Sequence, residues 1–104
     1  MIISTTHLVP NKEIEAILGI ARGSTVRSRN IGRDIVAALK NVVGGEIEEY
    51  TQLQADAREQ AMQRMIDDAK RLGADAVVGV LMTTAMVTNG AAEILAYGTA
   101  VKLK

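Results

Sequence analysis

The stretch from Ala76 to Val87 is apolar at nearly every position, and this feature constrains the fold more than any other. A strand with one face in water alternates apolar and polar side chains, whereas this one does not. Val77, Leu81 and Val87 predict one apolar face, and a second set predicts the other: Val78, Val80, Met82 and Met86. The chain therefore exposes more apolar sheet than its own helices can cover, which predicts a subunit of an oligomer.

A hairpin is predicted directly after this strand. Asn89-Gly90 is a strong signal for a tight turn between two antiparallel strands. The second strand is predicted over Ile94 to Leu103. Its more apolar face carries four residues: Leu95, Tyr97, Val101 and Leu103.

The segment before this strand predicts one long amphipathic helix. Thr51 and Gln54 have the spacing of a capping box, and Gly73 has the position of a helix stop. The apolar residues recur at steps of three or four and form one stripe, made of Leu53, Ala57, Ala61, Met65, Ala69 and Leu72 and widened by Met62 and Ile66. The acidic residues ahead of the helix, from Glu46 to Glu49, are predicted as the start of a strand.

The region from Ile14 to Arg29 allows two interpretations. Its apolar residues alternate as in a strand, although some of them also fit a helix face. Gly19 and Gly23 would each weaken a helix by about 1 kcal/mol, which favours a long, bulged strand. A short strand is predicted over residues 2–5, and a turn is predicted over residues 7–12 because of Pro10 and Asn11.

A first helix is predicted between Asn30, which can cap its start, and Gly44-Gly45, which can end it. Its apolar residues fall at helical spacing: Ile31, Ile35, Leu39 and Val42. The elements together predict one domain, residues 1–104, of the α+β class. We expect a two-layer sandwich in which two helices pack on one face of an antiparallel sheet.

Composition narrows the classes of function. Twelve acidic and twelve basic residues give no net charge, which lends no support to nucleic-acid binding. The absence of cysteine excludes disulfides, zinc knuckles and thiol catalysis. No apolar run has the length of a membrane span, and the first residues lack the pattern of a signal peptide. We therefore expect a cytoplasmic protein without nucleic-acid or membrane partners.

A group of short segments, in this order and spacing, resembles a known bacterial family. The segments are Val42-Val43-Gly44-Gly45, Tyr50, Ala57-Arg58, the run from Gly73 to Val80, and Gly98-Thr99-Ala100-Val101. Over nearly its whole length the chain is similar to the YbjQ-like (UPF0145) heavy-metal-binding domain family. The resemblance implies helices on one side of an antiparallel sheet and assembly into rings, expected to be pentamers. The family name also implies a divalent or soft metal ion, but no mechanism.

Candidate metal ligands are few. Soft metals are usually held by about four ligands, with Cys or several His among them, and this chain offers only His7. A solvated turn histidine is the simpler interpretation, although a ring could bring several copies of His7 together. Glu46 and Glu48 would share one face of a strand and could bind a hard cation. Alternatively, they form an acidic edge that discourages strand pairing.

Leu81, Met82, Met86 and Tyr97 are the predicted oligomer interface, because they lie on the two apolar strands. No catalytic residue is predicted, since no acid is placed to orient His7. We therefore expect a homo-oligomer with a structural or ligand-binding role and no enzymatic activity. The alternative is an enzyme for a small anionic substrate at a subunit interface, which would use His7 and the arginines between Arg22 and Arg33.

Overall fold

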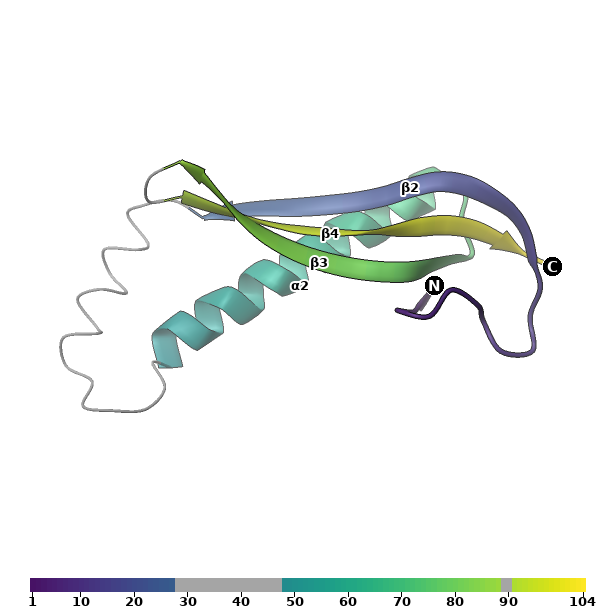
Figure 1. The fold of residues 1–104 in the computed structure, drawn as a ribbon, viewed down its shortest axis with the longest axis horizontal. Helices are drawn as coiled ribbons and strands as arrows, with labels where there is room; N and C mark the ends of the chain where they lie inside the picture. The colour runs from purple at the N-terminus through teal and green to yellow at the C-terminus, as the bar shows by residue number, and fades with distance from the viewer. Residues whose placement is uncertain (28–47, 89–90) are drawn as a thin grey trace.

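The computed structural model describes residues 1–27, 48–88 and 91–104. Over these residues the elements are β1 (Ile2–Ile3), β2 (Ile14–Arg27), α2 (Glu48–Arg71), β3 (Ala76–Thr88) and β4 (Ala91–Leu103) (Figure 1). The strands form one sheet in the order β1-β3-β4-β2, and α2 lies along one face of it. The α+β class and the two layers are thus confirmed. The predicted first helix lies outside the described residues.

The sheet is mixed and not wholly antiparallel, so that part of the prediction was wrong. β2 and β3 both run antiparallel to β4, but β1 runs parallel to β3. The Ser4 amide donates to the Val77 carbonyl at 3.0 Å, and the Val80 amide donates to the Ser4 carbonyl at 3.1 Å. The parallel pair involves only a few residues at the start of the chain, and so short a segment carries no signal of its direction.

The predicted hairpin and the predicted long strand are both confirmed. β3 and β4 are antiparallel neighbours, with Thr88 opposite Ala91. β4 begins three residues earlier than the predicted Ile94. β2 is continuous from Ile14 to Arg27, and its register shifts near Ala16 and again near Gly19, as expected of a bulged strand.

The predicted turn before β2 is also confirmed. The Lys12 amide donates to the Val9 carbonyl at 3.2 Å, which closes a four-residue turn. Pro10 takes the second position, where its fixed φ suits the turn, and Asn11 takes the third with a φ of 63°. This turn places Val9, which is 8% exposed, over one end of the sheet.

α2 begins at Glu48, so the prediction that a strand starts at Glu46–Glu49 was wrong for Glu48 and Glu49. The capping box was also wrong, because Thr51 lies inside the helix. Glutamate has a high helix propensity, and negative charge is favourable near a helix N-terminus, so the acidic residues suit the first turn. The predicted stop is confirmed: α2 ends at Arg71, and Gly73 follows with a φ of 81°.

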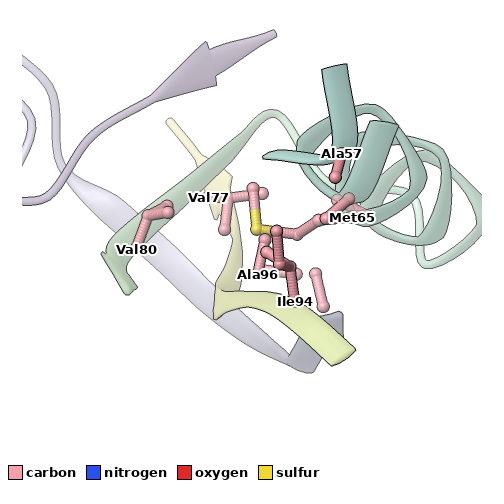
Figure 2. Packing of buried hydrophobic residues seen from close by; sticks show 10 residues of the cluster. Ala57, Met65, Val77, Val80, Ile94 and Ala96 are labelled. Atoms are coloured by element: carbon pink, nitrogen blue, oxygen red, sulfur yellow. The ribbon is translucent and has the colours of Figure 1, made fainter. Parts of the chain in front are cut away.

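The predicted apolar stripe of α2 forms the main core. Four of its residues are at most 1% exposed: Ala57, Ala61, Met65 and Ala69. Figure 2 shows the Met65 side chain reaching from the helix toward Val77, Ala96 and Ile94 on the sheet. In the absence of phenylalanine and tryptophan, a flexible methionine fills the space between small residues.

Gly23 allows α2 to lie directly against β2. A Cβ atom at this position would lie 2.2 Å from the Met65 backbone nitrogen and 2.4 Å from the Ala61 carbonyl oxygen. Both distances are far shorter than any van der Waals contact, and both atoms belong to the rigid helix backbone. The close approach of α2 to β2 therefore requires glycine at position 23.

Candidate functional site

A bulge in β3 decides which side chains face α2. Gly79 has a φ of 63°, and the register with β4 shifts between Val78 and Leu81. Val77 and Val80 both pack in the core against α2, whereas Val78 belongs to a second cluster on the other face. The prediction that Val77 and Leu81 share a face was therefore wrong, because the inserted glycine reverses the alternation.

The second cluster covers only one end of the face opposite α2. It consists of Val9, Ala76, Val78 and Val101, with Ile14 and Leu103 packed at its margin. Beyond this cluster the sheet surface opposite the helix, here called the helix-free face, is open. Its exposed large side chains are Ile17 (73%), Ile20 (67%), Val26 (54%) and Leu81 (58%).

The strand register places these side chains in one patch that also contains polar residues, since Ile20 is opposite Thr99 and Val26 is opposite Glu93. Leu81 on β3 is opposite Tyr97 on β4, which in turn is opposite Arg22 on β2. Leu95 and Tyr97 are half-buried in the middle of the patch. A patch with several exposed large aliphatic side chains marks a contact surface, so the helix-free face is the strongest candidate contact surface among the described residues.

The four predicted interface residues lie on two different faces. Leu81 and Tyr97 are cross-strand neighbours on the helix-free face. Met82 is opposite Ala96, which belongs to the helix-side core, so Met82 and, by alternation, Met86 lie on the helix side. They are nevertheless 39% and 70% exposed.

The outer part of β3 is uncovered on both faces. Residues 81–88, here called the distal arm, are all exposed, whereas Ala76, Val77, Val78 and Val80 are buried. The pairing with the N-terminal segment ends at Val80. Within residues 1–27, 48–88 and 91–104, no strand pairs with the outer edge of the distal arm.

The outer edge of β2, in contrast, is capped by side chains of α2. The Asp68 carboxylate accepts a hydrogen bond from the Arg22 amide at 3.0 Å. The Arg64 guanidinium donates to the Ser24 carbonyl at 2.6 Å. The pKa of Asp68 is lowered, first by the hydrogen bonds from Arg71 and then by that from the Arg22 amide. The helix thus occupies backbone groups that another strand would need.

A second carboxylate joins the start of β3 to the end of β4. Asp75 accepts a hydrogen bond from the Leu103 amide at 2.9 Å and forms an ion pair with Lys102 at 3.4 Å. The Leu103 bond is the main cause that lowers the pKa of Asp75. This arrangement accounts for Asp75 as a structural residue at the end of the two central strands.

His7 lies against the bulge of β3. A Cβ atom at Gly79 would lie 3.1 Å from His7 Nδ1, so both this contact and the positive φ favour glycine at position 79. The nearby hydroxyls are used within the loop: Ser4 Oγ accepts from the Thr6 amide at 3.0 Å, and Thr6 Oγ1 donates to the Leu8 carbonyl at 2.8 Å. Sequence reasoning missed this contact, although a glycine inside an apolar strand signals a bulge.

The metal-ligand prediction is not tested by the structure. Glu46 lies outside the described residues, and Glu48 lies in the first turn of α2, not on a strand. Within the part of the chain that is described, no group of three His, Asp or Glu residues could hold a metal ion. One subunit, as described, therefore does not supply the donor set that the family name implies.

Of the described groups that the alternative enzymatic interpretation needs, His7 and Arg27 lie far apart along the sheet. His7 lies beside Gly79, two residues before Leu81. Leu81 is in line with Tyr97 and Arg22 across the strands. Arg27 lies five residues farther along β2, about 17 Å at about 3.4 Å per residue. Arg29 and Arg33 lie outside the described residues. No described helix is long and apolar enough to cross a membrane.

Comparison with known proteins places these features in a family. A family model described as "Putative heavy-metal-binding" matches residues 1–104. A UPF0145 protein of Archaeoglobus fulgidus is 59% identical over 104 residues, covering 100% of this chain and 96% of its own length. A UPF0145 protein of Methanosarcina acetivorans is 55% identical over 103 residues, covering 99% and 97%. One from Vibrio campbellii is 54% identical over 103 residues, covering 99% of each chain.

A solved structure supports the fold. The crystal structure of a protein of unknown function from Pediococcus pentosaceus, described as a member of the DUF74 family, aligns with a TM-score of 0.64. It covers 100% of this chain and 98% of the other at 17% identity, so it speaks for the fold alone. The names of the relatives state no reaction. Whole-length identity above one half and the matching family model show that the chain belongs to the UPF0145 family.

Proposed function

We propose that the chain is a subunit of a homo-oligomer, a pentameric ring, in which the helix-free face is covered by a neighbouring copy. The observation that carries the proposal is the set of four large aliphatic side chains on that face, each more than half exposed. Burying one such side chain fully is worth roughly 1.5–3 kcal/mol, so several together favour association. The number of subunits comes from the resemblance to the family.

The proposed role is structural or ligand-binding, and not enzymatic. The ligand is a small molecule or a divalent or soft metal ion held where subunits meet. Symmetry supports this placement, because a ring would bring together several copies of a single donor such as His7. The partner is a second copy of the chain and not nucleic acid or a membrane, and the location is the cytoplasm. The zero net charge supports the exclusion of nucleic acid.

The assembly is tested by placing one charge on the helix-free face. Leu81→Asp should lower the mass measured by light scattering while leaving the circular dichroism spectrum unchanged, because an interfacial carboxylate without a partner is costly to bury. Gln60→Asp is the matched control, since Gln60 is exposed on α2. A Leu81→Asp protein with the mass of the unmodified assembly would exclude the helix-free face as the contact.

Metal binding is tested by calorimetric titration with zinc, cadmium and copper(I). Binding to the assembly that is lost in His7→Ala would support a site built by symmetry. Binding that survives this substitution would point to Glu46 and Glu48, or to the methionines. No binding to either protein would remove the metal from the proposal and leave the structural role.

A further inference from the structure

We propose that the outer edge of the distal arm pairs with the same edge of a second copy, in an antiparallel ladder centred on Thr84. This inference rests on the self-association proposed above and adds a second contact to it. It identifies the edge, the register and the symmetry of the pairing.

The backbone groups on this edge point outward in a regular pattern. The Val80 amide donates outward to the Ser4 carbonyl at 3.1 Å. From Leu81 to Met86 the register with β4 is regular, so backbone groups alternate between the two sides of the strand. The amide and carbonyl groups of Met82, Thr84 and Met86 therefore point away from β4, where no described strand receives them.

The two outer edges of the sheet are treated differently by the chain. On β2, Asp68 and Arg64 occupy backbone groups of Arg22 and Ser24. The distal arm has no such cap among the described contacts, and its sequence, Leu-Met-Thr-Thr-Ala-Met-Val-Thr, contains no charged residue and no proline. Natural edge strands that must not pair usually carry such residues. The distal arm lacks both kinds of protection.

The sequence of the distal arm identifies a second copy as its partner. In an antiparallel pairing centred on Thr84, this residue faces its own copy, Met82 faces Met86, and Leu81 faces Val87. The methionine pairs lie on the helix side of the joint sheet. Centring the pairing on Thr83 would instead place Met82 against Thr84 and Leu81 against Ala85. Of these two registers, only the first brings methionine against methionine and a large aliphatic side chain against another.

The backbone groups that point away from β4 also fit the register centred on Thr84. Thr84 with its own copy, and Met82 with Met86, become hydrogen-bonded pairs that exchange both of their N–H···O bonds. Such a contact has two-fold symmetry, so it joins subunits in pairs. It cannot close a five-membered ring by itself. Combined with a ring formed through the helix-free face, it joins two pentameric rings.

The register is tested by crosslinking, because the chain has no cysteine of its own. Two Thr84→Cys residues would have Cα atoms about 5.5 Å apart across the two-fold axis. A short bismaleimide should therefore link most of the protein into covalent dimers at micromolar concentration. Thr88→Cys is the matched control: its two copies would be about 27 Å apart at about 3.4 Å per residue, and should not be linked.

A second variant tests the backbone bonds. Thr84→Pro removes the outward amide at the axis, and an edge strand tolerates proline where its amide faces solvent. Native mass spectrometry should show half the mass of the unmodified assembly for Thr84→Pro and the full mass for Thr84→Val. An assembly that is not crosslinked at Thr84→Cys, or whose mass Thr84→Pro leaves unchanged, overturns the edge pairing alone. An unmodified protein of 11.1 kDa overturns the proposed self-association as well.

Discussion

The two halves of β3 have similar sequences and opposite surroundings. From Ala76 to Val80 the apolar side chains are at most 4% exposed, whereas from Leu81 to Thr88 every residue is exposed. The first half lies between the core under α2 and the loop that carries Val9. The second half is exposed although Met82 and Thr84 lie opposite Ala96 and Ile94 of that core. Figure 1 shows the end of β3 beside β2 and β4. An apolar pattern thus predicts that a segment will be buried, but not whether its own subunit or a neighbouring one buries it.

The core that covers the first half of β3 should not tolerate a charged side chain. Met65→Asp places a carboxylate where the side chain is 0% exposed, against Val77, Ala96 and Ile94. We expect a loss of at least about 4 kcal/mol, comparable with the whole stability of a small domain, so the chain should unfold. Far-ultraviolet circular dichroism during heating measures this. An unchanged melting temperature would mean that the helix does not bury this residue.

The same substitution in the open half sharpens the comparison. Met86 is 70% exposed, so Met86→Asp should change the stability of the single subunit by no more than about 0.5 kcal/mol. Its effect should be on assembly, and native mass spectrometry should show a lower mass. Unfolding of Met86→Asp would show that the distal arm is packed within the subunit itself.

Gly23→Ala tests the close seating of α2 in the covered half. The added methyl group would overlap the Met65 nitrogen and the Ala61 oxygen, so the helix must move away from β2. We expect a loss of about 3 kcal/mol, at the upper end of the usual cost of overpacking. Urea unfolding followed by circular dichroism gives the value. Ser24→Ala, at the neighbouring position of the strand, is the control and should cost much less.

A stabilising change is expected at Thr25. This residue is 2% exposed, and its hydroxyl has no hydrogen-bond partner within the described structure. Because an unsatisfied buried hydroxyl costs about 1–3 kcal/mol, Thr25→Val should raise the free energy of unfolding by about 1 kcal/mol. The matched change in the open half, Thr84→Val, should leave subunit stability unchanged. A lower melting temperature for Thr25→Val would show that the hydroxyl is satisfied.

The smallest expected effect is on acid sensitivity. Because the pKa of Asp68 is lowered in the folded chain, its stabilisation is complete above the ordinary value of about 3.9 and is lost as the pH falls through the folded pKa. Asp68→Asn should therefore lose less stability than the unmodified protein on acidification from about pH 5 to about pH 2. Asp67→Asn, one residue away, is the control. Equal acid sensitivity in all three proteins would contradict the capped β2 edge.

Local signals in the sequence predicted the elements well. The stripe of α2, the turn at Pro10 and Asn11 and the β3–β4 hairpin each depend on neighbours in the sequence, and each is confirmed. Three other features were missed, because the local sequence alone does not determine them. The parallel pairing of β1 is a long-range contact, the reversal of faces at Gly79 follows from one inserted residue, and the acidic start of α2 reads equally as strand or helix.

The faces on which the predicted interface residues lie depend on the same bulge. Leu81 and Tyr97 were predicted as interface residues, and the structure pairs them on the helix-free face. Met82 and Met86 lie on the face opposite Leu81, as their alternation predicted, and the bulge before them makes that face the helix side. The predicted metal ligands stay a prediction, because Glu46 lies outside the described residues and one histidine is too few donors for a site.

Sedimentation equilibrium of the unmodified protein tests the central claim, that other copies cover what α2 leaves open. The account predicts a mass close to that of a pentamer, or of two pentamers joined through the distal arm, stable at micromolar concentration. A single species of 11.1 kDa throughout the micromolar range would contradict it, because the helix-free face and the distal arm would then both remain in water.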